Sequence, residues 1–216
     1  MKKIAVLQQI IFAYCIFIVF MLAARLCLTG SLQFYFLAWN IFLAYIPFVI
    51  SKYLFLYQLK QRKKWEFLLG VGIWLLFFPN ALYIVTDLIH LQIVTNVPKW
   101  FDVILLFSSS ALGLLLAFAS LYIIEQILKV YLSVKHIQFA VFVILFIASF
   151  GVYLGRFLRW NSWDIIQRPF ILLQDVGERL IYPHEHIRTW AITIFFTILF
   201  CLIYFTIQKL SKILVK

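Results

Sequence analysis

Four polar residues recur at helical spacing in the stretch FPNALYIVTDLIHL, residues 78–91: Asn80, Tyr83, Asp87 and His90. Successive residues of an α-helix turn by about 100°, so these four side chains fall within an arc of about 80°. An aspartate and a histidine on one face can exchange protons with a bound molecule or take part in an ion relay. Because lipid offers no hydrogen bonds, such a face inside a membrane must point toward other helices or a wet cavity.

A second polar stretch, GRFLRWNSWDIIQRP, occupies residues 155–169. Its two arginines, Arg156 and Arg159, are spaced about one helical turn apart, and two neighbouring cations favour a carboxylate or a phosphate as partner. An ion pair with an acid such as Asp87 or Asp164 is the first interpretation, and a bound anion is the second. The two stretches together define the candidate site.

Simpler interpretations account for other residues of both stretches. Asn161 is expected to cap a short interfacial helix, and the tryptophans beside it suit an aromatic belt at the membrane surface. Gly151 and Gly155 have the spacing of small residues that let two helices approach closely. Around Pro79, which removes a helical hydrogen bond, Asn80 and Thr86 could repair the kink while Asp87 and His90 face interfacial water.

Composition defines the class of protein. The chain has 216 residues, of which 65% are hydrophobic and only 12% are charged, whereas soluble domains have about 25% charged residues. Apolar runs of about 20 residues can cross the roughly 30 Å hydrocarbon core as helices. We therefore predict an all-α, polytopic membrane helix bundle that forms a single domain, residues 1–216. The six expected transmembrane helices are residues 5–24, 34–56, 66–88, 103–127, 137–158 and 189–208.

Basic residues predict the orientation, because they are retained on the cytoplasmic side. With the N-terminus inside, 12 lysines and arginines fall in cytoplasmic segments and 7 in outer ones. The expected location is thus the cell membrane, with both termini cytoplasmic and both polar stretches on the outer side. The formal charge of +11 then reflects topology and attraction to anionic lipid heads. It does not indicate nucleic acid, because the basic residues lie in short loops beside the spans.

The pairing of PNALYIVTDLIHL with GRFLRWNSWDI resembles an uncharacterised prokaryotic integral membrane family catalogued as domain of unknown function 1361. The similarity covers most of the chain from the second span onward. It implies an integral membrane protein and brings no assigned activity or cofactor. The residues that match the motif pattern are Pro79, Asn80, Tyr83, Thr86, Asp87, His90, Gly155, Arg156, Arg159, Trp160, Asn161, Trp163 and Asp164.

The last outer loop contains a predicted interfacial helix in PFILLQDVGERLIYP, residues 169–183. Its expected lipid-facing residues are Phe170, Leu173, Val176 and Leu180, and its expected water-facing residues are Asp175, Glu178 and Arg179. The histidines that follow, His184 and His186, could join His90 in a zinc-type site. Histidines two apart in a loop are more often plain polar residues, so no metal site is predicted.

These observations leave three functions open. The first is a site for an anionic lipid head or phosphate group, and the second is a small transporter with an Asp/His relay. The third is a non-catalytic subunit of a membrane complex. Against a transporter, no paired broken helices or inverted halves are visible, and the inner side lacks matching buried charges. Glu125 and Lys129 near the inner surface are expected to form a helical ion pair. Asn40 and Pro47 in the second span are better explained by repair of a kink.

The expected partners are membrane lipids, including an anionic lipid or small anion. No nucleophile motif, phosphate loop or dinucleotide fingerprint is present, so neither an enzyme activity nor a cofactor is indicated. If chemistry occurs, its candidate catalytic residues are Asp87, His90 and Asp164. The candidate ligand-binding residues are Asn80, Tyr83, Asp87, His90, Arg156, Arg159, Asn161 and Asp164.

Overall fold

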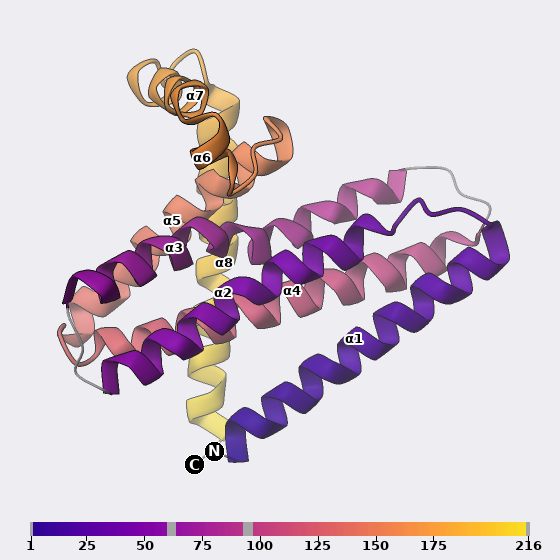
Figure 1. The fold of residues 1–216 in the computed structure, drawn as a ribbon, viewed down its shortest axis with the longest axis horizontal. Helices are drawn as coiled ribbons and strands as arrows, with labels where there is room; N and C mark the ends of the chain where they lie inside the picture. The colour runs from indigo at the N-terminus through magenta and orange to yellow at the C-terminus, as the bar shows by residue number, and fades with distance from the viewer. Residues whose placement is uncertain (1, 60–63, 93–96, 215–216) are drawn as a thin grey trace.

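A computed structural model describes residues 2–59, 64–92 and 97–214, and this part of the chain folds into helices joined by short connections (Figure 1). No strand occurs among the described residues, which confirms the predicted all-α class. The elements are α1 (Lys2–Thr29), α2 (Phe36–Leu59), α3 (Lys64–Tyr83), the 3₁₀-helix η1 (Ile84–Gln92), α4 (Lys99–Leu128), α5 (Val134–Phe157), α6 (Asp164–Gln167), α7 (Pro169–Ile181) and α8 (Ile187–Leu214).

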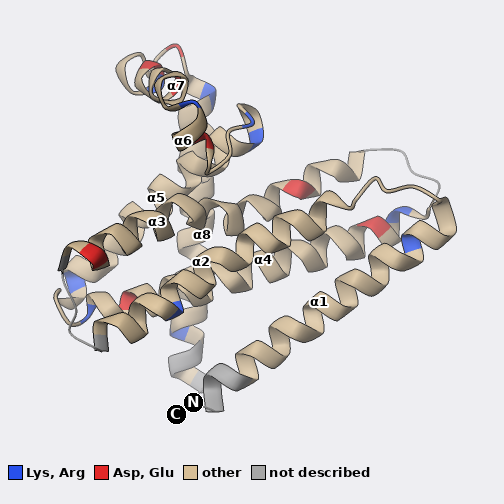
Figure 2. Cartoon of the chain, in the orientation of Figure 1, with Lys and Arg blue, Asp and Glu red and all other residues tan. Residues whose placement is uncertain are grey.

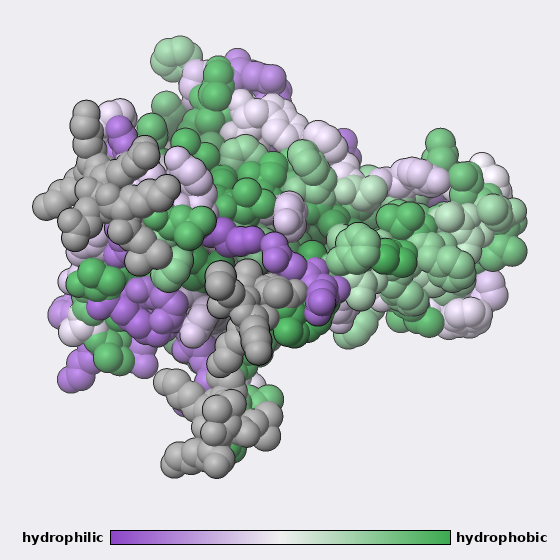
Figure 3. Space-filling model, turned by 60° about the horizontal axis from the view of Figure 1, so that its bottom comes forward, coloured by the Kyte–Doolittle hydropathy of each residue, from purple (hydrophilic) through white to green (hydrophobic). Residues whose placement is uncertain are grey.

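Six of these segments are long and apolar enough to cross a membrane, so the predicted number of spans is confirmed and the chain is a multi-pass membrane protein. They run over Val6–Thr29, Phe36–Gln58, Trp65–Gln92, Lys99–Leu128, Val134–Phe157 and Ile187–Leu210. Charged residues lie mostly toward the helix ends and around α6 and α7 (Figure 2). Hydrophobic side chains cover much of the visible surface in Figure 3, as lipid contact requires.

The helices α2, α3 and α4 form the centre of the bundle. α2 packs on α3 and on α4, α1 packs on α4, and α5 packs on α3. α8 packs mainly on α5 and crosses the other long helices steeply in the view of Figure 1. The buried core is accordingly richest along α4, from Phe101 to Ile127.

Glycines let α4 and α5 approach the third span closely. A Cβ atom on Gly113 of α4 would lie 2.7 Å from the carbonyl oxygen of Ala81, and one on Gly151 of α5 would lie 2.7 Å from Cγ of Pro79. A Cβ on Gly155 would lie 3.3 Å from the ring of Tyr83. The close contact predicted from the spacing of Gly151 and Gly155 is therefore confirmed, and it brings α5 against the polar stretch of α3.

The third span is not one regular α-helix, and this corrects the simple helical arc from which the candidate face was predicted. The α-helix continues through Pro79 to Tyr83, and the chain then winds as a 3₁₀-helix to Gln92. The β-branched run Ile84–Thr86 disfavours the α-helix, and the Thr86 hydroxyl donates a 2.6 Å hydrogen bond to the Tyr83 carbonyl. In a 3₁₀-helix residues three apart are eclipsed, so Asp87 and His90 stay on one side.

The connection between α5 and α8 contains the predicted short helix, α7, but two of its side chains are oriented differently from the prediction. Phe170 and Leu173 are exposed as expected. Arg179, expected to face water, is buried, and its guanidinium donates to the Asp175 carbonyl at 2.5 Å. Val176, expected to face lipid, lines a cavity beside α3 and α5. α7 therefore contributes Val176 to the cavity wall, while Arg179 is bound to its own helix.

Candidate functional site

An ion pair between the two polar stretches forms the centre of the candidate site. The carboxylate of Asp87 on η1 accepts a hydrogen bond from Nη2 of Arg156, at the end of α5, at 2.5 Å. Its other oxygen accepts from the side-chain amide of Asn40 on α2 at 2.9 Å. Asp87 is fully buried and Arg156 nearly so. The predicted contact between these two residues is confirmed, and Asp87 does not face interfacial water.

The guanidinium of Arg156 has further partners on the third span. Its Nε donates to the hydroxyl of Thr86 at 2.8 Å, and Nη1 lies 3.4 Å from Nε2 of His90. The same group lies over the ring of Tyr83, 4.7 Å from its centroid. A carboxylate, a hydroxyl and an aromatic face together compensate the cost of burying the Arg156 cation. Arg156 therefore joins α5 to η1 without needing a ligand.

A separate polar cluster lies at α6. The carboxylate of Asp164 accepts hydrogen bonds from the backbone N–H of Asn161 at 2.7 Å and from Arg168 at 3.1 Å. The Asn161 backbone N–H, followed by Arg168, holds the pKa of this carboxyl below its usual value. The expected cap was therefore wrong: the Asn161 side chain makes no cap bond, and the acid of the short helix binds the backbone of Asn161 instead.

The connection between α5 and α6 folds back along the third span. Ser162 donates a hydrogen bond to the Leu76 carbonyl at 2.9 Å and accepts one from the side-chain amide of Asn80 at 2.9 Å. The same amide group donates to the Phe77 carbonyl at 3.1 Å. These bonds satisfy backbone groups near Pro79, where the proline removes a helical donor. The Asn80 and Ser162 bonds reach the carbonyls of Phe77 and Leu76, next to the Leu75 carbonyl that Pro79 leaves without its helical donor. The repair predicted for Asn80 is therefore present only at neighbouring carbonyls.

Arg159 differs from Arg156 in conformation and environment. Its φ of 60° is the only positive value at a non-glycine residue among those described. A left-handed residue just beyond a helix is usually glycine, because a side chain there costs about 1–2 kcal/mol. The Arg159 side chain is exposed on the rim of a cavity, and within the described part of the chain it has no hydrogen bond or ion pair. Its charge therefore remains available to a ligand.

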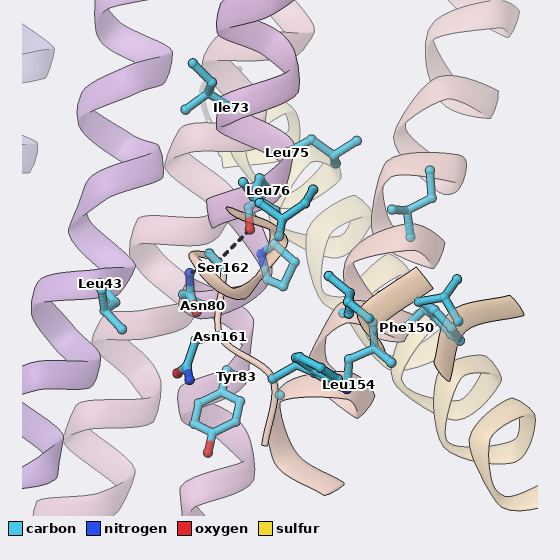
Figure 4. Close-up of a pocket in the computed structure, with 18 of the residues that line it drawn as sticks. Leu43, Ile73, Leu75, Leu76, Asn80, Tyr83, Phe150, Leu154, Asn161 and Ser162 are labelled. Carbon is cyan, nitrogen blue, oxygen red and sulfur yellow. Dashed lines mark hydrogen bonds between the residues drawn. The ribbon is translucent and has the colours of Figure 1, made fainter. Parts of the chain in front are cut away.

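A cavity of about 1190 Å³ lies between α2, α3, α5, the connection after α5, and α7. Its polar lining is grouped together: Figure 4 shows Asn80, Asn161 and Tyr83 near one another, with Phe150 and Leu154 across from them. Leucines and isoleucines make up most of the remaining wall. The charged and amide residues of the lining are Asn40, Asn80, Arg156, Arg159 and Asn161.

The structure divides the predicted site residues into two groups. Those that line the cavity are Asn80, Tyr83, Arg156, Arg159 and Asn161. Those that support it from outside the lining are Asp87, His90 and Asp164. Sequence interpretation missed Asn40 as the second partner of Asp87, although an asparagine in an apolar helix was a visible signal. It also missed Ser162, which lies within the second polar stretch.

The histidines considered for a metal do not come together in the described residues. No group of three or more His, Cys, Asp or Glu side chains suited to a metal occurs there. His184 is exposed and lies 3.7 Å from Glu185, its nearest acidic partner. His90 instead packs against the ring of Phe36, with centroids 5.0 Å apart.

Buried ion pairs and hydrogen bonds also lie outside the candidate site. Arg25 at the end of α1 pairs with Asp102 at the start of α4 at 2.9 Å. Near the other end of α4, Glu125 pairs with Lys129 at 3.0 Å as predicted, and also accepts a 2.6 Å hydrogen bond from Tyr204 of α8. Glu125 is buried, so the expectation that the end of the bundle predicted to face the cytoplasm lacks buried charges was wrong.

The family model described as "Protein of unknown function (DUF1361)" matches residues 39–203. This match covers more than half of the chain and includes both polar stretches, so the chain belongs to that family and the resemblance noted from its motifs is confirmed. No curated protein and no solved structure matched the chain.

Proposed function

We propose that this member of the DUF1361 family binds an anionic lipid in the cavity beside α3 and α5. The observation that supports this most directly is Arg159, whose cation is held on the cavity rim in a strained backbone conformation and without a protein partner among the described residues. Strain of this kind persists where the surrounding structure enforces it, and it gathers at ligand sites. A phosphate oxygen is a suitable partner for a free guanidinium.

The remainder of the cavity suits a hydrocarbon chain. Its volume of about 1190 Å³ is above the roughly 300–1,000 Å³ of ordinary small-molecule pockets. Several lining residues, including Leu68, Leu69 and Trp39, are more than half exposed. These residues lie on apolar spans, so the cavity opens sideways to lipid and a chain can enter from the bilayer.

The geometry favours binding over a proton relay. Asp87 does not line the cavity, and both of its oxygens are occupied by Arg156 and Asn40. A relay needs an acid that can change partners as ions pass. The ion pair serves instead to hold Arg156 at the cavity wall, next to the free charge of Arg159.

The binding test uses the detergent-solubilised full-length protein and two lipids that share their acyl chains, dioleoyl phosphatidylglycerol and dioleoyl phosphatidylcholine. A ligand that binds only the folded state raises the unfolding temperature, so the anionic lipid should raise it more. Arg159→Gly should abolish the difference, while Arg159→Lys should retain part of it. Lys99→Gln, which removes an exposed charge outside the cavity, is the matched control.

Glycine relieves the left-handed strain at position 159. The ligand-free Arg159→Gly variant should therefore unfold at the same temperature as the wild type or at a higher one, which separates loss of binding from loss of folding. Equal stabilisation by the two lipids, or an undiminished difference in Arg159→Gly, would refute the proposed site.

For location, we propose the cell membrane with both termini cytoplasmic. The support is the distribution of basic residues, 12 on the proposed inner side against 7 outside. The most basic segment, QRKK at residues 61–64, falls largely outside the described residues. In this orientation the polar stretches and Arg159 belong to the outer half of the bilayer.

A further inference from the structure

The cavity is longer along α3 than one leaflet of a bilayer is thick. Its lining on this helix runs from Leu68 to Tyr83, a distance of about 22 Å at 1.5 Å per residue. One leaflet contributes only about 15 Å of a hydrocarbon core roughly 30 Å thick. Leu68 lies three residues after the start of the span at Trp65, so the groove continues almost to the opposite membrane face.

The lining changes character along this length. Its polar and charged side chains lie around Tyr83, Arg156 and Arg159, whereas the far end is formed by Leu68, Leu69, Gly72 and Ile73. Beyond the residues near Asn80 the lining contributed by α3 is wholly apolar. A ligand that fills the groove therefore has one polar head and a long apolar tail, and the tail crosses the bilayer midplane.

The charge at the polar end limits the head. Among the lining residues the charged side chains are Arg156 and Arg159, and Asp87 neutralises the first of them. One net positive charge remains. This charge neutralises most of a single phosphate group, which has a charge of about −1.5 to −2 at pH 7 as a monoester. A head with two phosphates would leave much more negative charge uncompensated at low dielectric.

We infer that the ligand is a lipid monophosphate whose hydrocarbon chain is longer than one leaflet, of the polyprenyl phosphate type. This inference rests on the proposed function and adds the substrate class. Ordinary phospholipid tails end near the midplane and would leave the Leu68 end of the groove to other lipids. Lipid hydrocarbon is as apolar as a leucine-lined wall, so the extra length adds no hydrophobic energy. It adds van der Waals contacts along the apolar wall, and these contacts favour the longer chain.

Gly72 offers a way to shorten the groove without disturbing the fold. It lines the apolar end, is exposed, and a Cβ there would meet no atom within 4 Å. Leucine at this position should block the far end of the groove. Gly177 on α7 has the same free space around a Cβ and does not line the cavity, so Gly177→Leu is the matched control.

The experiment measures affinity for undecaprenyl phosphate and for decyl phosphate, whose chain is too short to reach Gly72 from the polar end. Wild type should bind the long probe about tenfold or more tightly than the short one, since the longer chain makes many more van der Waals contacts with the groove wall. Gly72→Leu should remove most of this preference and leave decyl phosphate binding unchanged. Gly177→Leu should change neither value.

Folding of each variant is checked by its ligand-free unfolding temperature, and Leu68→Trp is a second blocking variant at the same end. If Gly72→Leu and Leu68→Trp both fold and keep the full preference, the chain does not extend along the groove and the inference is wrong. Equal affinity for dioleoyl phosphatidylglycerol and the long probe would also show that the inference is wrong, but it would leave the proposed site for an anionic lipid intact. If the proposed function itself were wrong, the result would be different: the affinity for every phosphate-bearing probe would be unchanged in Arg159→Gly.

Discussion

The ion pair between Asp87 and Arg156 should behave as one energetic unit. Replacing Asp87 by leucine leaves a guanidinium whose side chain is only 12% exposed, and breaking a buried pair in this way costs about 3–5 kcal/mol. Neutral polar contacts in membrane proteins are worth less, about 0.6 kcal/mol on average. Because Arg156 ends a helix and can shift toward water, we expect the lower end of the first range, about 3 kcal/mol.

Arg156→Met should cost a similar amount, about 3 kcal/mol, since it leaves the fully buried Asp87 with Asn40 as its remaining partner. The double variant Asp87→Leu/Arg156→Met removes both charges. It loses the hydrogen bonds to Asn40 and Thr86, each worth about 1 kcal/mol, so its total cost should be near 2 kcal/mol. Independent sites would instead give about 6 kcal/mol.

The free energy of unfolding is measured for all four proteins by reversible denaturation in mixed detergent micelles, followed by tryptophan fluorescence. Lys129→Met is the control, because Lys129 is 46% exposed in its pair with Glu125 and such pairs are worth at most about 1 kcal/mol. A double variant as unstable as the sum of the single ones would show that Asp87 and Arg156 do not compensate each other, and the site geometry would have to be abandoned.

Three further outcomes are expected. A single cysteine at Lys63 should resist an impermeant thiol reagent in intact cells, because basic loops stay inside; strong labelling would reverse the orientation and move the site inward. The pKa of Asp164 is lowered in the folded protein, so its ionised carboxylate stabilises the fold. This stabilisation is complete above the usual aspartate pKa of about 3.9, and it is lost as the pH falls through the lower pKa of the folded state. Thermal unfolding at pH 7 and pH 3 should therefore show a smaller difference between wild type and Asp164→Asn at pH 3, and a constant difference would contradict the Asn161 contact. Gly113→Ala should cost about 1–3 kcal/mol in chemical unfolding, because its Cβ would lie 2.7 Å from the Ala81 carbonyl oxygen; a neutral result would mean that α4 yields easily.

The amino-acid sequence alone determined the membrane class and the six spans. A hydrocarbon solvent requires every backbone hydrogen bond to be made within the segment, so long apolar runs have only the helix available. The pairing of Asp87 with an arginine of the second stretch also followed from the sequence. Both residues end spans that run in the same direction, and neither can remain unpaired at the edge of hydrocarbon.

Other features depended on packing that no local pattern specifies. The sequence pointed to either Arg156 or Arg159 as the partner of Asp87. The tertiary structure pairs Asp87 with Arg156, on a helix that Gly155 allows to approach Tyr83 closely. The 3₁₀ winding of η1 is stabilised by a Thr86 hydroxyl that also accepts from Arg156. The helix propensity of a short segment predicts its structure only weakly, and tertiary contacts such as these override it.

The cavity itself was decided by tertiary structure alone. It exists because the chain after α5 turns back to Leu76, where Ser162 binds the carbonyl, and because α7 then covers the space with Val176. A turn of this kind is set by hydrogen bonds between residues 86 positions apart in the chain, which helical periodicity cannot reveal. The sequence therefore located the charges of the site, while the fold decided which of them, above all Arg159, remained free for a ligand.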